Sequence, residues 1–182
     1  TTEAATQTTT PATEATTALV VKPVENVEKK PLKEVNLTSF EQNGAQFEEV
    51  DMTTEEYNEF LPTRFRVAQQ GNVNSIFLNA TAGDSWVTYK TDDNVIKKFV
   101  LRQGRTVFMR GELIRLFVGN PDALKIFFNS APVKVRKAGK ITPRNIVVPE
   151  ARRTEFKQPL FIFQDDGSAL TSSEYETMRA SN

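Results

Sequence analysis

The acidic residues in the middle of the chain are the first candidates for chemistry, because proton-transfer catalysis often uses two carboxylates that face one cleft. Residues 63–153 contain six such residues: Asp84, Asp92, Asp93, Glu112, Asp122 and Glu150. Gly83 precedes the first of them and Pro121 precedes Asp122, so turn chemistry explains their positions. We therefore expect these acids to lie on separate turns rather than to form a catalytic pair.

The residue types that are absent exclude several other kinds of site. The chain contains no histidine and no cysteine. This excludes zinc sites built from those residues, histidine-based triads, disulfides and thiol chemistry. The sequences Asp92-Asp93-Asn94 and Asp165-Asp166-Gly167 lack the twelve-residue calcium-loop pattern, and no glycine-rich phosphate loop is present. We expect neither a metal nor a cofactor, and no catalytic residue is assigned.

The charges are segregated along the chain although the formal net charge is zero. Residues 1–62 hold 12 acidic and 4 basic residues, residues 63–153 hold 6 and 17, and residues 154–182 hold 5 and 2. The basic centre offers a candidate interaction surface made of Arg102, Arg105, Arg110, Arg115, Arg136, Lys137 and Lys140. A solvated sheet face balanced by the acidic arm is the favoured interpretation, and an anionic partner is the alternative. Nucleic acid would need exposed aromatic residues among these charges, so we do not expect it as a partner.

Two aromatic residues of the basic centre are also candidates for an interaction surface. Trp86 is the only tryptophan, and Tyr89 lies three residues further along the same expected strand. We expect Trp86 to belong to the core, because aromatic residues in alternating strands are usually buried. If Trp86 or Tyr89 is instead exposed, it could stack on a sugar ring.

Elements that would position these residues begin at residue 74, where apolar and polar residues start to alternate with a period of two. β-Branched and aromatic residues dominate, and turn residues interrupt them every seven to ten positions. The pattern predicts a mainly β fold, a compact antiparallel sandwich or barrel of about seven to eight short strands. The expected strands cover residues 74–81, 85–90, 95–101, 105–110, 113–118, 124–128, 133–135 and 146–148.

One short helix is expected before the strands, over about residues 53–61. Thr53 and Glu56 have the spacing of a capping box, and Pro62 disfavours helical geometry in the residue before it. Three apolar residues share one face of this helix: Tyr57, Phe60 and Leu61. So short a helix is unstable alone in water, so we expect this face to pack against the β-domain.

The remaining segments are expected to be flanks. Residues 1–38 form a disordered linker rich in Thr, Pro and Glu, since they contain too little apolar surface to offset the entropy of ordering. Residues 39–73 connect it to a β-domain over residues 74–149. In the extension over residues 150–182, residues 160–163 (LFIF) could add an edge strand, and we expect the rest to be loose.

An ordered series of features runs from Ser75 to Val135. Trp86 opens the second strand after a polar turn, and Leu101 and Gly104 form a step of leucine, two residues, glycine. The sequence LFVGN at residues 116–120 then precedes an alanine-containing turn and the next strand. This stretch resembles the C-terminal extracytoplasmic β-domain of RodZ-type bacterial cell-shape proteins. The family often has glycine where this chain has Asn94 and Ser130, but these residues also tolerate turns.

The resemblance implies a location and a role. Such proteins have a cytoplasmic helix-turn-helix domain that meets the actin-like protein MreB, a single membrane helix, a flexible linker and then this domain in the periplasm. No run of apolar residues in this chain approaches 18, so a membrane anchor would lie upstream of it. We expect a non-catalytic periplasmic interaction module of a membrane-anchored cell-elongation protein, which contacts envelope proteins or the cell wall. The alternatives are a peptidoglycan-binding module and, less favoured, an enzyme that acts on the wall.

Overall fold

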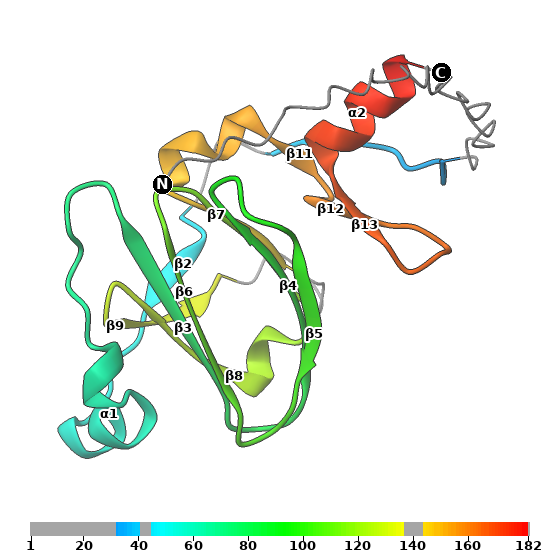
Figure 1. Cartoon of the computed structure of the whole chain (residues 1–182). Coiled ribbons are helices and arrows are strands. Elements are labelled where there is room, and N and C mark those ends of the chain that lie inside the picture. Colours follow the sequence, from blue (N-terminus) through cyan, green and yellow to red (C-terminus); the bar gives the residue numbers. More distant parts are fainter. Residues whose placement is uncertain (1–31, 41–44, 137–143, 182) are drawn as a thin grey trace, which may run out of the picture. The chain divides into compact units, whose positions relative to one another are not determined.

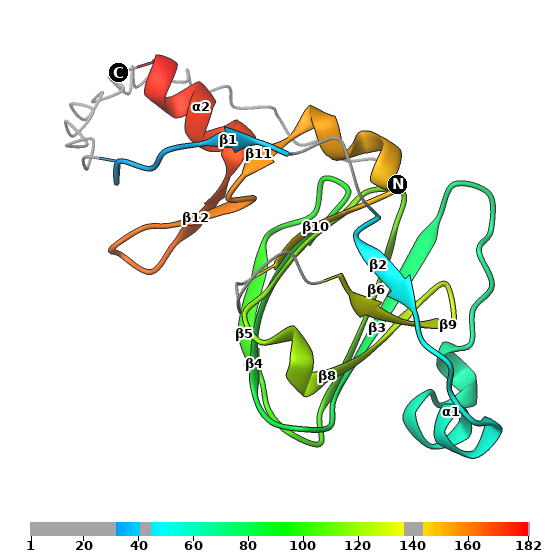
Figure 2. The same ribbon diagram turned by 180° about the vertical axis from the view of Figure 1, so that it is seen from behind.

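The computed structural model describes residues 32–40, 45–136 and 144–181 (Figures 1 and 2). Every strand predicted from the sequence over residues 74–148 is present, with ends that shift by up to two residues. The strand predicted over 95–101 begins at Lys97, and those predicted over 133–135 and 146–148 begin at Ala131 and Arg144. The strands that form the two main sheets are β2 (Phe47–Glu49), β3 (Asn74–Ala80), β4 (Ser85–Thr91), β5 (Lys97–Leu101), β6 (Thr106–Gly111), β7 (Ile114–Val118), β8 (Leu124–Phe128), β9 (Ala131–Val135) and β10 (Arg144–Val148).

These strands pair antiparallel into a four-stranded sheet in the order β10-β7-β4-β5 and a five-stranded sheet in the order β2-β9-β8-β3-β6. The inward residues of both sheets form one apolar core, to which β3 contributes Ile76 and Leu78 and β4 contributes Val87 and Tyr89. The alternation that predicted the strands therefore also predicted this shared core. The predicted antiparallel sandwich is confirmed.

A helical layer covers the outer face of the five-stranded sheet. It consists of α1 (Thr54–Phe60) and the 3₁₀ helix η1 (Thr63–Phe65), and Thr53 and Glu56 form the predicted capping box at the start of α1. Leu61 follows α1, is fully buried, and packs with Phe77 of β3 and Phe127 of β8. The predicted short helix is thus present as α1, with η1 after it and with β1 (Thr38–Ser39) and β2 before it, which the sequence did not indicate.

The C-terminal extension is ordered, so the expectation of a loose tail is wrong. It forms the 3₁₀ helix η3 (Glu150–Glu155), the strands β11 (Lys157–Gln158), β12 (Phe161–Phe163) and β13 (Ala169–Thr171), and the helix α2 (Ser172–Ala180). Residues Leu160 and Phe161 pack with Leu113 and Val147 in a second apolar cluster on the outer face of the four-stranded sheet. The predicted strand at residues 160–163 exists as β12, but it pairs with β13 in a hairpin of its own and extends neither main sheet.

The end of the predicted linker takes part in this arrangement. Residues Thr38–Ser39 form strand β1, which pairs with β11, and the Val35 N–H donates to the Tyr175 hydroxyl at 3.1 Å. The linker therefore does not extend to residue 38 as predicted. Its residues 1–31 lie outside the part of the chain that the structure describes. No helix in the described part is long and apolar enough to cross a membrane.

Candidate functional site

Three of the candidate carboxylates line one hollow on the surface, although the sequence places them on different turns. Asp92 and Asp93 follow β4, Glu112 follows β6, and all three line a cavity of about 660 Å³ together with Arg110 and Arg152. The two turns meet because their strands β4 and β7 are neighbours in the sheet. The expectation that these acids lie apart is therefore wrong for these three. Asp84 and Asp122 do not line this cavity.

Hydrogen bonds show what Asp92 does in this hollow. Its N–H donates to the Leu113 carbonyl at 2.8 Å, and its carboxylate accepts from the Leu113 N–H at 2.9 Å. Gly111 leaves room for this carboxylate, since a Cβ there would lie 2.8 Å from Asp92 Oδ2. Asp92 thus locks two hairpins together. In the described part of the chain, no three His, Cys, Asp or Glu residues form a group that could hold a metal ion.

Trp86 is not a core residue, contrary to the prediction. Its side chain is 42% exposed on the outer face of β4. The indole Nε1–H donates to the Thr88 hydroxyl at 3.0 Å, and the ring meets that of Phe163 edge-on, with 6.2 Å between the centroids. The alternation predicted correctly which residues of β4 share a face. In the structure the face with Val87 and Tyr89 is in the core, and Trp86 lies on the other face, at the edge of the C-terminal extension. Tyr89 is 7% exposed, so of the two candidate platforms only Trp86 is accessible.

The candidate basic residues do not form one continuous surface. Arg102 and Arg105 flank the turn before β6, whereas Arg110 lies near the other end of that strand. Several are paired: Arg102 with Asp84 at 3.1 Å, Arg110 with Gln70 at 2.7 Å, and Arg136 with Glu48 at 3.3 Å. Lys137 and Lys140 lie outside the described residues.

The pair between Arg136 and Glu48 links the acidic arm to the basic domain. Glu48 lies on β2 and also forms an ion pair with Lys134 at 3.1 Å. These cations outweigh desolvation and lower the pKa of Glu48, mainly through the hydrogen bond from Lys134. The acidic segment and the basic segment of the sequence therefore form ion pairs with each other at the five-stranded sheet.

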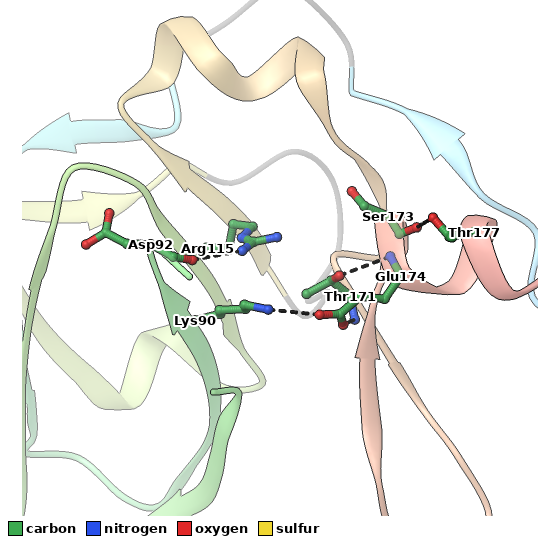
Figure 3. Close-up of polar contacts among 7 residues, drawn as sticks. All are labelled: Lys90, Asp92, Arg115, Thr171, Ser173, Glu174 and Thr177. Atoms are coloured by element: carbon green, nitrogen blue, oxygen red, sulfur yellow. Dashed lines mark hydrogen bonds and ion pairs between the residues drawn. The ribbon is translucent and has the colours of Figure 1, made fainter. Parts of the chain in front are cut away.

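Arg115 is buried rather than part of a surface, with 7% of its area exposed. Its guanidinium donates to the Asp92 carbonyl at 3.2 Å (Figure 3). It also stacks over the ring of Phe156. Burial lowers the pKa of Arg115 because desolvation disfavours the charged form, although Glu174 and Asp93 oppose this change. Arg115 thus fastens the four-stranded sheet to the C-terminal extension.

Lys90, its neighbour on β4, makes the second polar contact of this junction. Its ammonium lies 2.9 Å from a carboxylate oxygen of Glu174 in α2 (Figure 3). Thr171 and Glu174 form a capping box at the start of that helix. Partial burial alone would raise the pKa of Glu174, but hydrogen bonds from Lys90 and Thr171 outweigh burial and lower it.

Sequence reasoning missed this junction, although a signal for part of it was present. The sequence Thr171-Ser-Ser-Glu174 has the same capping-box spacing as Thr53 to Glu56, and it marks the start of α2. Nothing in the local pattern indicates that Lys90 or Arg115 would be covered by residues more than 40 positions away. Their burial follows from the docking of the extension.

The predicted helix face lies on the β-domain in the structure. Tyr57 donates its hydroxyl to the Ser130 carbonyl at 3.1 Å and meets the ring of Phe127 edge-on. Phe60 packs in the same cluster, and Lys125 of β8 stacks over its ring. The outer face of the five-stranded sheet is thus covered by the segment that precedes β3 in sequence.

These features define a class of protein: an antiparallel β-sandwich whose N-terminal and C-terminal flanks pack on its outer faces. Residues 78–146 match the family model described as the RodZ C-terminal domain. This part of the chain is therefore a RodZ-type C-terminal domain, and the resemblance seen in the sequence is confirmed. No curated protein and no solved structure gives a significant match to the chain.

Proposed function

We propose that the chain is the non-catalytic periplasmic interaction module of a membrane-anchored protein that acts in cell shape and cell elongation. The match of residues 78–146 to the RodZ C-terminal domain carries this proposal. The matched residues run from β3 to β10 and so cover most of the sandwich. RodZ-type C-terminal domains are structural and interaction domains, so the proposed function of this one is to bind a partner.

The proposed partners are proteins of the envelope and of the elongation machinery, or peptidoglycan. Contact with the membrane would be made only by an anchor upstream of this chain, and nucleic acid is not a proposed partner of this segment. The supporting observation is that the candidate basic residues in the described part of the chain are distributed, and that several have partners within the chain: Arg102 and Arg136 pair with acids, and Arg110 with Gln70. These described residues do not form the continuous basic stripe that binding to a phosphate backbone requires.

A pull-down from a bacterial envelope extract tests the proposal. The 182-residue chain is immobilised, and the captured proteins are identified at low and at high salt. We expect components of the elongation machinery to be enriched over a bait of unrelated sequence. Loss of these partners at high salt would indicate a contact through charges, since ions screen exposed pairs. If no protein of the elongation machinery and no wall fragment is enriched at either salt concentration, the proposed function is wrong.

Peptidoglycan binding is the second candidate function, and the exposed indole of Trp86 favours it. The ring is held at its edge by Thr88 and Phe163, which leaves part of its surface for a sugar ring. Co-sedimentation of the chain with purified cell-wall sacculi tests this candidate. Binding that is lost in Trp86→Ala and retained in Tyr89→Phe would support it, because Tyr89 is buried and the change keeps the ring.

A further inference from the structure

Strand β5 has a free edge. It is the last strand of the four-stranded sheet and pairs with β4 on one side, and no strand among the described residues pairs with its other side. A strand at the edge of a sheet presents unpaired backbone N–H and C=O groups. The opposite end of the same sheet differs: the buried side chain of Gln46 donates to the Val147 carbonyl at 2.6 Å and accepts from the Val147 N–H at 2.8 Å. At β10 a side chain thus satisfies the edge backbone groups of Val147, whereas no strand among the described residues covers the edge of β5.

Exposed apolar side chains stand next to this free edge. Val100 of β5 lies directly opposite Trp86 of β4, so both side chains point to the same face of the sheet. Val100 is 40% exposed and Trp86 is 42% exposed. These two residues account for half of the large hydrophobic residues that are exposed among the described part of the chain. A strand added at β5 would lie directly beside Val100, and its longer side chains on that face would extend toward Trp86.

Trp86 is held in place before any partner arrives. Its hydrogen bond to Thr88 and its edge-on contact with Phe163 fix the ring from two sides. Gly119, which follows the neighbouring strand β7, admits the Trp86 side chain closely, since a Cβ at residue 119 would lie 3.1 Å from the Trp86 Cβ. An anchor that is already ordered loses little side-chain entropy on binding, which favours its use in an interface.

The charges at this edge select the kind of partner. Lys97 and Lys98 are consecutive exposed residues of β5, and Lys98 lies opposite Thr88, on the same face as Trp86. Lysine on an edge strand discourages pairing with arbitrary strands. The same positive charge attracts a strand that carries carboxylates. The cation that follows β5, Arg102, is already paired with Asp84.

We propose that the free edge of β5, with Trp86 and Val100 beside it, is the docking surface for an extended acidic segment of a partner protein, which adds to the sheet as a further strand. The proposal rests on the proposed function, since it names the kind of protein contact that the module makes. A peptide backbone supplies hydrogen-bonding groups at the spacing that an open strand edge requires. A second copy fits less well, because β5 contains two lysines and no acidic residue that could pair with the lysines of another copy.

A random twelve-residue peptide library displayed on phage is panned against the whole chain. We expect the enriched peptides to contain alternating β-branched and acidic residues, and the synthetic form of the strongest one is then titrated. Because Trp86 is the only tryptophan, its fluorescence reports binding at this site directly. Amide hydrogen exchange of β5 should slow in the complex, which contact of side chains alone would not cause. A library that gives no enriched peptide, or only basic or proline-rich ones, would overturn the proposal.

Three variants sharpen the test. Lys98→Glu should weaken binding of the acidic peptide about tenfold, since a repulsive contact replaces an attractive one. Val100→Asp should weaken it as well, whereas Arg179→Glu, an exposed change of the same charge on α2, should leave it unchanged. Equal losses in Lys98→Glu and Arg179→Glu would show a general charge effect and count against the surface.

Two further outcomes identify a different occupant. If soluble wall glycan changes the fluorescence of Trp86 and no peptide does, the surface binds sugar and the proposal is wrong. If sedimentation shows a dimer that Lys98→Glu alters, the occupant is a second copy, and the proposal is also wrong. The pull-down separates this proposal from the function on which it rests: partners captured equally by the wild-type chain and by the Lys98→Glu, Val100→Asp double variant would leave the module intact and exclude the β5 edge.

Discussion

At the scale of single residues, polar side chains satisfy backbone groups at the sheet edges that the strands leave unpaired. Gln46 is the clearest case, because its amide satisfies both backbone groups of Val147 in a buried position. A buried N–H or C=O without a partner costs free energy. The position therefore needs a residue that both donates and accepts, and a glutamine side chain does this.

We predict that Gln46→Leu lowers the free energy of unfolding by about 2–3 kcal/mol, since it removes both hydrogen-bond partners of Val147 and keeps a similar volume. Chemical denaturation followed by circular dichroism measures this difference. Gln69→Leu is the matched control, because Gln69 is exposed and its replacement should change stability by no more than about 0.5 kcal/mol. Equal effects of the two changes would contradict the role assigned to Gln46.

Glu174 allows a prediction about pH. Its pKa is lower in the folded protein than in the unfolded chain, so its contribution to stability is present above its unfolded pKa and is lost as the pH falls through the folded pKa. We expect Glu174→Gln to lower the free energy of unfolding by about 0.5–1 kcal/mol at pH 7, where the ion pair with Lys90 is intact. Glutamine also serves at this position of a capping box, so the change isolates the charge.

The difference between Glu174→Gln and the wild-type chain should shrink as the pH falls below ~4.3, the ordinary pKa of glutamate. Urea denaturation at a series of pH values from 7 down to the onset of acid unfolding measures it. The Lys90→Met variant is the control: in its background Glu174→Gln should cost less, because the partner is gone. A difference that does not depend on pH would mean that packing, and not the ion pair, is responsible.

At the scale of elements, each short helix is stable because it docks. Helix α1 has no buried residue of its own within Thr54–Phe60, and the residue that fixes it is Leu61 at its end. Phe77 and Phe127, which face away from the main core, supply the other side of this contact. The second apolar stripe on β3 is thus explained by the helix that covers it.

We predict that Leu61→Ala lowers the free energy of unfolding by about 3 kcal/mol, because it opens a cavity under a fully buried side chain. The exposed residue Glu59 offers a control on the same helix, and Glu59→Ala should have little effect. Thermal and chemical denaturation of both variants check this. If Leu61→Ala is as mild as the control, the helix is not held on the sheet in solution.

At the scale of the whole molecule, the sandwich is larger than the part that matches the family. The match ends at residue 146, yet the elements after it form an apolar cluster with Leu113 and Val147 of the sandwich. Those side chains lie on the outer face of the four-stranded sheet and would face water without the extension. The extension therefore acts as part of the folded unit.

We predict that a chain ending at Pro149 unfolds at a Tm more than about 5 °C lower than the full chain, since it exposes this cluster. It should also bind the dye ANS, which reports exposed apolar surface. A chain ending at Ala180, the last residue of α2, is the control and should behave like the full chain. A shortened chain with unchanged Tm and no dye binding would show that the extension contributes nothing to the fold.

The sequence by itself determined the strands over residues 74–148, their turns and the helix at residues 54–60, because these depend on alternation, turn residues and capping, all of which are local. It did not indicate β1, β2, β11 or β13. It also determined that the β-domain is basic and its preceding arm acidic. From the same local signals the capping box at Thr171 could have predicted α2.

Only the tertiary structure decided which faces are covered and by what. Alternation shows that β4 has two faces, but it does not show that Tyr89 is inside and Trp86 on the rim. Tyr89 is inside because that face packs on the five-stranded sheet, and Trp86 contacts the C-terminal extension more than 60 residues away. The same holds for the burial of Arg115 and for the meeting of Asp92 with Glu112 in one hollow. Burial depends on contacts between segments that are distant in sequence, and local sequence patterns do not specify those contacts.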